Sequence, residues 1–376
     1  MTPDDHALLR LLGCGGASAP RRLLLERHGS PEAALGAGER RWREAGLDDA
    51  QVHALARDPD VPAGTRDWFA PAGHRLLGWH DPDYPALLRR IASPPLALFV
   101  AGDANLLWHP AVAVVGSRAP TSGGRDHARD FAHALARAGF AVCSGLAAGI
   151  DTAAHEATLA AGGVTVAVLG SGIDVPYPRA NAGLHRRIAE GGVVVSEHPP
   201  GTQARREQFP ARNRIIAGLS LGTLVVEAAW RSGALITARL AADAGREVFA
   251  LPGSIHNPLA RGCHRLIRDG AALVETAGEV VTALAPVAQE LADALRSRLQ
   301  APISGVGSAV AASAGVLAPD DPDYQRLWSA LGHDPSPMDR LVERTGLTTA
   351  ELSSMLLVME LDGRIVLEHG RYSRKS

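Results

Sequence analysis

Short apolar runs alternate with helix-length segments through the middle of the chain. Each run is aliphatic or β-branched, is too short for a helix and ends at glycine or another turn former. A buried parallel strand has this continuous apolar pattern, because helices cover both of its faces. The alternation therefore predicts an α/β fold with a doubly wound parallel sheet and right-handed crossovers. The predicted strands are Ala111–Val115, Ala141–Cys143, Val164–Leu169, Val193–Ser196, Thr223–Val226, Val248–Leu251 and Ala272–Val274, and the helix-length segments include Gly124–Ala138, Thr152–Ala161, Arg212–Leu219 and Ala234–Ala244.

Composition shifts divide the rest of the chain into further segments. Residues 1–74 contain leucine clusters broken by glycine, and Ser30-Pro31 has the form of an N-cap followed by proline, so we expect a domain of short helices. The turn cluster Asp81–Pro85 lies at the entry to the central domain, which we place at residues 75–285. Residues 286–322 are rich in Ala, Gly and Ser, which predicts a flexible linker.

The last segment, residues 323–376, regains an amphipathic pattern. Thr348–Glu351 has the form of a capping box, and Leu352, Leu356 and Met359 would share one face of the helix that it opens. Turn residues then separate two short segments that are typical of a two-stranded wing. Helices followed by a wing predict a winged-helix domain. The wing strands are expected at Arg364–Glu368 and Arg371–Ser373.

Composition narrows the classes of protein to which the chain can belong. Apolar residues make up 46% and charged residues 21%, which suits a sizeable core and excludes a mainly disordered chain. The three cysteines are far apart, with no zinc spacing and no disulfide framework, as is typical of a reducing compartment. No basic region precedes an apolar stretch at the N-terminus, and no apolar run reaches 18 residues. We therefore expect a cytoplasmic protein without a membrane span.

The net charge of −2 by itself argues against a nucleic-acid binder, but the charge is unevenly distributed. In residues 75–285 arginines outnumber acidic residues by 20 to 17, whereas acidic residues are in excess in both flanking segments. The stretch Arg205–Arg214 is locally denser in arginine. This distribution is compatible with a phosphate-tracking groove in the central domain.

Glycine, serine and arginine follow several of the predicted strands. In an open parallel sheet ligands bind beyond the carboxyl ends of the strands, so these positions are candidates for a site. Glycine lets backbone amides approach a phosphate, and Arg118 would supply a planar bidentate donor. A tight turn needs glycine with or without a ligand, but four such turns along one edge favour an anion site. The turns are Gly116–Arg118, Ser144–Leu146, Gly170–Asp174 and Leu251–Ser254.

Signatures of cofactor binding and catalysis are missing from the sequence. No GxGxxG motif follows the first of the predicted strands, and a P-loop is excluded because the chain's only lysine is Lys375. Asp151 and His155 would face the same way on a helix and could form an acid–base pair, but an N-cap role for Asp151 fits better because no nucleophile accompanies them. The histidines show no metal-ligand spacing. We therefore expect no cofactor, no metal and no catalytic residue.

The densest polar cluster lies in residues Phe209–Gly218. Two isoleucines would bury one side of a helix there, while Arg212, Asn213 and Arg214 would lie in its first turn. Two arginines at a helix N-terminus oppose the macrodipole, at a cost of about a few tenths of a kcal/mol, unless an anion neutralises them. Their placement predicts a phosphate site.

Six motifs of the central domain resemble those of the DNA-processing protein A family, also called DprA or Smf. They occur in one order within roughly residues 75–285. The flanks agree, since members of that family often carry a helical SAM-like N-terminal domain and a winged-helix tail. The resemblance implies a Rossmann-like central domain. The motifs are Val115–Arg118, Ser144–Asp151, Tyr177–Asn181, Phe209–Ser220, Ser232–Ala238 and Phe249–Gly253.

The resemblance implies a function without catalysis. Members of the family bind single-stranded DNA taken up during natural transformation, shield it from nucleases and load the RecA recombinase onto it, working as homodimers. Binding would be mostly electrostatic, with a base or two stacked on Phe249 or Tyr177. The family's DNA pocket corresponds to Arg118, Arg179, Arg206 and Phe249, and the turns and clusters above add Gly116, Ser117, Ser144, Gly145, Gly172, Tyr177, Asn181, Arg212, Asn213 and Arg214. The family's dimer surface corresponds to His264, Ile267, Arg268 and Leu273.

Two other functions are compatible with parts of the sequence. Gly222–Glu227 is similar to the GGxGTxxE loop of nucleotide phosphoribohydrolases on a related fold, which favours a nucleotide-binding enzyme, although Ser220-Leu221 replaces the paired glycines. The winged-helix tail alone would suit a regulator that binds duplex DNA. Residues 286–376, however, carry 9 basic against 12 acidic residues, so a protein-docking role fits that tail better.

Overall fold

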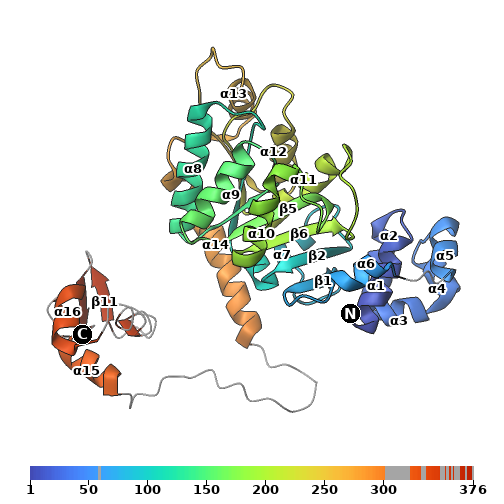
Figure 1. Cartoon of the computed structure of the whole chain (residues 1–376), viewed down its shortest axis with the longest axis horizontal. Helices are drawn as coiled ribbons and strands as arrows, with labels where there is room; N and C mark the ends of the chain where they lie inside the picture. Colours follow the sequence, from blue (N-terminus) through green and yellow to red (C-terminus); the bar gives the residue numbers. More distant parts are fainter. Residues whose placement is uncertain are drawn as a thin grey trace. The chain divides into compact units, whose positions relative to one another are not determined.

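Figure 1 shows the computed structural model of the chain. It describes residues 1–57, 61–300, 322–331, 336–347, 365–368 and 371–374, together with positions 352, 355, 356 and 359. The chain forms two compact units, Met1–Ala301 and Pro302–Ser376.

The first unit begins with six short helices, as the leucine and glycine pattern predicted. Thr2 caps the first of them in a capping box with Asp5, and the Ser30 side chain accepts from the Ala33 amide at the start of the third. Leucines of these helices pack with β1, β2 and α10 in one apolar cluster, and the helices lie beside that end of the sheet (Figure 1). The helices are α1 (Pro3–Gly13), α2 (Ser18–His28), α3 (Pro31–Gly36), α4 (Gly38–Glu44), α5 (Asp49–Ala56) and α6 (Ala63–Trp68).

A nine-stranded sheet follows, with the strand order β1-β2-β6-β5-β4-β3-β7-β8-β9. All the neighbouring pairs from β6 to β9 are parallel, which confirms the predicted α/β fold. The bounds are β1 (His74–Gly78), β2 (Ala97–Gly102), β3 (Ala111–Val115), β4 (Ala141–Ser144), β5 (Thr165–Gly172), β6 (Val193–His198), β7 (Gly222–Val225), β8 (Glu247–Ala250) and β9 (Ala272–Leu273).

Two strands were absent from the sequence prediction. β1 and β2 pair antiparallel with each other, and β2 pairs antiparallel with β6, so the sheet is mixed rather than wholly parallel. Only the four-residue helix α7 (Ala86–Arg89) lies between them, and no crossover helix is needed because an antiparallel pair reverses direction. The alternation of strands and long helices therefore could not indicate them.

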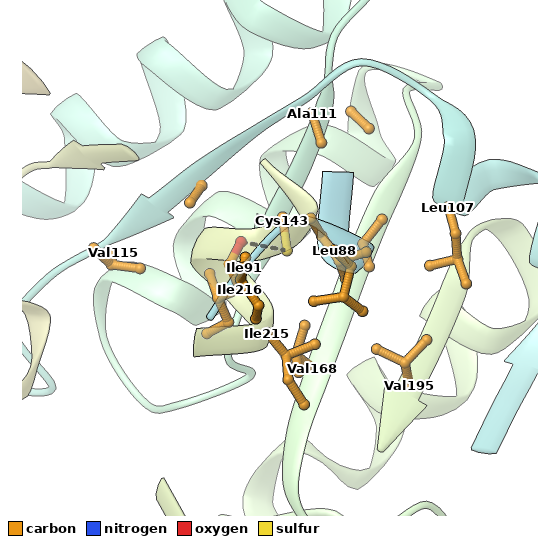
Figure 2. Close-up of a cluster of buried hydrophobic side chains, with 14 of the residues drawn as sticks. Leu88, Ile91, Leu107, Ala111, Val115, Cys143, Val168, Val195, Ile215 and Ile216 are labelled. Atoms are coloured by element: carbon orange, nitrogen blue, oxygen red, sulfur yellow. Dashed lines mark hydrogen bonds between the residues drawn. The ribbon is translucent and has the colours of Figure 1, made fainter. Parts of the chain in front are cut away.

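Helices cover both faces of the sheet and bury alternate residues of each strand. On β3, Ala111, Ala113 and Val115 belong to a cluster with α11 and α12, whereas Val112 and Val114 face α8, α9 and α14. Figure 2 shows the first of these clusters, where the isoleucines of α11 meet the strand side chains. The remaining helices are α8 (Ser122–Arg137), α9 (Ile150–Ala160), α10 (Ala182–Gly191), α11 (Gln208–Leu219), α12 (Gly233–Asp243), α13 (Arg261–Arg268), and the 3-10 helices η1 (Ala104–Trp108) and η2 (Arg179–Asn181).

The last helix of the first unit corrects the predicted linker. α14 runs from Ala277 to Gln300 with Pro286 inside it, so residues 286–300 are helical. Val280 and Leu284 are buried in the core beside α8, and the sequence after Pro286 is rich in Ala, Leu, Gln and Glu, which are strong helix formers. Packing and propensity together outweigh the proline. The rest of the predicted linker, residues 301–321, lies outside the described residues.

The second unit has helices and a three-stranded sheet in the order β10-β12-β11. β11 and β12 pair antiparallel, as expected of the wing. Leu352, Leu356 and Met359 are buried in a core with Leu327 and Leu341, as their shared helix face predicted. The capping box predicted at residues 348–351 lies outside the described residues. The elements are α15 (Pro322–Ala330), β10 (Ser336–Pro337), α16 (Met338–Thr345), β11 (Ile365–Glu368) and β12 (Arg371–Arg374).

Candidate nucleic-acid interface

A groove of about 690 Å³ lies at the carboxyl ends of the parallel strands. The loop after β3, the start of α11 and the first turns of α12 form its walls. This is the edge at which an open α/β sheet binds ligands, and we refer to it as the strand-end groove. Seven of the residues predicted to contact DNA line it: Gly116, Ser117, Arg118, Tyr177, Arg206, Arg212 and Asn213.

Two aromatic rings, tilted at 47° to each other, and an arginine form a contact group in this groove. The Tyr177 side chain is 48% exposed, and its ring centroid lies 5.3 Å from that of Phe209. The Arg118 guanidinium carbon lies 5.4 Å from the Phe209 centroid. The exposed Tyr177 ring offers a base a stacking surface, and the Arg118 guanidinium offers a phosphate a charged donor. The sequence prediction did not assign Phe209 to the site, although its place between Arg206 and Arg212 was a usable signal.

Phe249 does not contribute to that surface, contrary to the prediction. It is 1% exposed and packs in the core of the sheet, where its ring lies next to Gly222. The prediction failed because alternate residues of β8 point to opposite faces, and burial on both faces leaves no pattern that tells an edge residue from a core residue. Stacking of a base on Phe249 is therefore excluded in this fold.

Arg212 is a buried residue that lines the groove and has a structural role. α11 begins at Gln208, so Arg212 lies in its second turn and the expected conflict with the helix dipole does not arise. Its Nη1 donates to the Val168 carbonyl, and the guanidinium packs so closely against Gly145 that a Cβ there would collide with it. Burial lowers the Arg212 pKa to about 10, an effect that the nearby Asp151 carboxylate opposes.

Asp151 is the electrostatic partner of Arg212, not the cap that we predicted. The N-cap of α9 is Gly149, and the Asp151 carboxylate turns back to accept from the amides of Gly145 (3.1 Å) and Ala147 (3.3 Å). Burial raises the pKa of Asp151, while Arg212 and these two amides favour its charged form. The carboxylate thereby holds the loop after β4 against α9.

His155 is one turn along α9 from Asp151 and is also structural. The Thr165 hydroxyl donates to the Val142 carbonyl (2.9 Å), so its oxygen accepts from Nδ1 of His155 (2.7 Å), and the ring is neutral with Nε2 unprotonated. Burial lowers the His155 pKa to about 3. A base buried in this way has no access to a substrate, so the structure excludes the acid–base pair considered from the sequence.

Ser144 and Asn181 are buried and do not line the groove. The Ser144 hydroxyl donates to the Val114 carbonyl (2.7 Å), and the Asn181 amide donates to Leu146 O and Thr152 Oγ1 (both 2.9 Å). Leu146 has a φ of 57°, in the left-handed region that a bulky residue rarely adopts, and the Asn181 bond holds it there. Both side chains are buried and donate hydrogen bonds within the protein, so the predicted contact of Ser144 and Asn181 with DNA is wrong.

Three other predicted residues lie away from the groove lining. Arg214 forms a two-pronged ion pair with Glu197 (Nη2–Oε2 2.6 Å, Nη1–Oε1 3.0 Å), which neutralises it. Gly172 is required by packing, since a Cβ there would lie 2.7 Å from Pro199 O and Thr202 N. Arg179 is exposed at the start of η2, two residues after Tyr177.

Glu227, the last residue of the Gly222–Glu227 segment, is separated from Thr223 by three residues, one more than in the GGxGTxxE loop, and its carboxylate is hydrogen-bonded within the protein. Its carboxylate accepts from the Thr121 amide (2.9 Å) and hydroxyl (2.7 Å) and from the Asn257 side chain (3.1 Å). A Cβ at Gly124 would collide with it. The residue ties α8 to the loop before α13. Among the described residues, no group of three or more His, Cys, Asp or Glu side chains is placed to hold a metal ion.

The four predicted dimer residues lie together on α13 and β9. β9 is an edge strand, and Leu273 on it is 47% exposed. Ile267 packs partly against the core, Arg268 is exposed, and a ring nitrogen of His264 lies 2.9 Å from Gly253 O. We refer to these four residues as the α13–β9 patch.

Family models match most of the chain. The model described as DNA recombination-mediator protein A matches residues 75–285, and that of the DprA winged helix domain matches residues 311–371. Protein Smf from Escherichia coli is 41% identical over 312 residues, which cover 82% of this chain and 79% of that protein. The DNA processing protein DprA from Streptococcus pneumoniae is 50% identical over 201 residues, covering 54% and 71% respectively.

Two solved structures share the fold. The X-ray structure of DNA processing protein A from Streptococcus pneumoniae has a TM-score of 0.67 and 38% identity, and the match covers 75% of this chain and 98% of that one. DNA processing protein A from Helicobacter pylori, whose structure is described in terms of its single-stranded DNA binding mode, has a TM-score of 0.52 and 28% identity, covering 57% and 96%. No helix in the described part of the chain has both the length and the apolar character that crossing a bilayer requires.

Proposed function

Because the chain belongs to the DNA recombination-mediator protein A family, we propose that it binds single-stranded DNA in the strand-end groove. The observation that carries the proposal is the contact group of Tyr177, Phe209 and Arg118 in the lining of that groove. Arg206 adds a second exposed cation, while the charges of Arg212 and Asp151 offset each other. The groove therefore offers stacking surfaces and net positive charge, which suits binding that depends little on sequence.

The proposed function also includes two protein partners, the RecA recombinase and a second copy of this chain. We propose that the protein shields incoming single strands in the cytosol and loads the RecA recombinase onto them, acting as a homodimer through the α13–β9 patch. An exposed leucine on an edge strand supports the dimer, because pairing with a second copy would cover both. We assign DNA binding to residues 75–285, flanked by the SAM-like helices of residues 1–74 and by the winged-helix domain.

We also propose that the protein is not an enzyme, because its buried carboxylates and His155 are not open to a substrate. The carboxylates of Glu227 and Asp151 are engaged by amides and side chains of the protein, and His155 is buried and neutral. A nucleotide phosphoribohydrolase would need a carboxylate open to the substrate. Incubating the pure protein with nucleoside monophosphates should therefore release no ribose 5-phosphate, and robust turnover would contradict this part of the proposal.

The test of DNA binding is fluorescence anisotropy with a labelled dT oligomer and a duplex of equal length. We expect the single strand to bind more tightly than the duplex, and log Kd to rise with log salt concentration by about 0.7 for each phosphate neutralised. An unlabelled oligomer of mixed sequence should compete equally well. Equal affinity for the single strand and the duplex, or binding that salt does not weaken, would contradict the proposal.

A further inference from the structure

A second hollow, of about 660 Å³, lies on the other side of α12 from the strand-end groove. α12, α13 and β8 form its walls, and we refer to it as the α12–α13 hollow. The two depressions share Ser232 and Ile236 in their linings, so they adjoin at the N-terminal turn of α12. Ile236 is 41% exposed at that junction.

The hollow repeats the chemistry of the groove. Trp230 is 50% exposed, and the Arg265 guanidinium carbon lies 5.1 Å from its ring centroid. The groove has the equivalent pairing between Arg118 and Phe209, next to an exposed Tyr177. Tryptophan gives the largest stacking surface of the aromatic side chains, and half of this one is open to solvent.

Positive charge is in excess around the hollow. Its lining contains Arg231, Arg239, Arg246 and Arg265 but only two acidic residues, Glu247 and Asp269. The ion pairs of Arg239 with Asp243 (3.8 Å) and of Arg265 with Asp269 (3.4 Å) are exposed. Exposed pairs of this kind contribute little to stability, so a phosphate can replace the carboxylate at low cost.

We propose that a single strand leaves the strand-end groove over Ser232 and Ile236 and continues into the α12–α13 hollow, where a base stacks on Trp230. The extension rests on the proposed function, because it needs a strand already held in the groove. Continuity of the two depressions and the matched aromatic–arginine pairs favour a nucleic acid over an acidic protein partner, and the cationic lining disfavours an apolar partner.

Oligomer length separates the two sites. A short oligomer such as dT5 fills the groove alone, whereas dT20 reaches both depressions. In the full chain, Trp230→Ala should weaken dT20 binding about tenfold and leave dT5 binding unchanged, because one stacked base is lost. Trp230→Phe should restore most of the dT20 affinity. Ile255→Ala, which truncates an exposed apolar side chain outside both linings, is the matched control and should change neither affinity.

Photo-crosslinking locates the strand directly. A dT20 carrying 5-iododeoxyuridine at successive positions should crosslink to Trp230 from positions several nucleotides away from those that crosslink to Tyr177. If Trp230→Ala binds dT20 as tightly as the wild type, or if no position crosslinks to Trp230, the extension is wrong while the proposed function stands. A wild-type chain that binds neither oligomer would overturn both.

Discussion

Arg212 and Arg214 lie two positions apart on α11, yet neither is free to hold a phosphate as the sequence predicted. Arg212 points into the fold toward Val168 O and Asp151, and Arg214 pairs with Glu197. α11 begins four residues earlier than expected, so both arginines lie in its second turn and not at its N-terminus. Residue types in the groove could therefore be predicted from sequence, but side-chain directions could not.

Tyr177 and Phe249 should differ in their effect on DNA binding, because one ring is exposed and the other is buried. Tyr177→Ala should weaken single-strand binding roughly 5- to 150-fold, because a stacked base is worth about 1–3 kcal/mol. Tyr177→Phe keeps the ring and should keep the affinity. Phe249→Leu should leave DNA affinity unchanged while lowering the free energy of unfolding by roughly 1 kcal/mol, because Phe249 is a core residue. Anisotropy titration and urea unfolding measure the two effects, and a DNA-binding defect in Phe249→Leu would refute this assignment.

His155 gives a prediction about acid stability. Its pKa is near 6.5 in the unfolded chain and about 3 when buried, so between these values only the unfolded state takes up the proton. The stability contributed by its neutral burial is complete above pH 6.5 and is lost progressively as the pH falls toward 3. His155→Phe removes this titration and should reduce the slope of unfolding free energy between pH 6 and 4 by about 1.4 kcal/mol per pH unit. Identical slopes in the two proteins would show that His155 is not buried and neutral.

At the scale of elements, the parallel strands could be predicted because burial on both faces leaves short, continuous apolar runs such as Ala111–Val115. β1 and β2 were not predicted from the sequence, because their antiparallel pairing involves no crossover helix.

The extension of α14 past Pro286 was not predicted for a different reason. Composition suggested a linker, but contacts of the preceding turns with the core, which a local pattern does not contain, stabilise the helix.

The proposed dimer through the α13–β9 patch can be tested at Leu273. Leu273 is half exposed on an edge strand, so Leu273→Arg should not unfold the subunit. In the proposed dimer it would bury an unpaired charge on both sides of the two-fold axis and so give a monomer. That monomer should bind single-stranded DNA less tightly, because one groove replaces two linked ones. Light scattering with a melting curve as control measures the change, and a folded dimer of Leu273→Arg would defeat the interface.

At the scale of the whole molecule, the second compact unit is acidic, because residues 302–376 contain 7 basic and 10 acidic residues. The strand-end groove lies in the first unit. Removing residues 302–376 should therefore change single-strand affinity less than about twofold, since an acidic unit adds no phosphate contacts. Anisotropy with dT20 measures this, after circular dichroism has shown that the shortened chain is folded. A tenfold loss would mean that the winged-helix unit contacts the strand.

The central claim is that single-stranded DNA binds at the carboxyl edge of the sheet, and paired charge reversals on α8 and the loop before it test it most directly. Arg118 lies in the groove, and Arg137 is exposed in the last turn of α8, at the opposite edge of the sheet. The account predicts that Arg118→Glu weakens dT20 binding about tenfold, roughly 1.4 kcal/mol, and that Arg137→Glu leaves it within twofold of the wild type, both proteins being folded. Equal affinities of Arg118→Glu and the wild type, or a larger loss in Arg137→Glu, would contradict it.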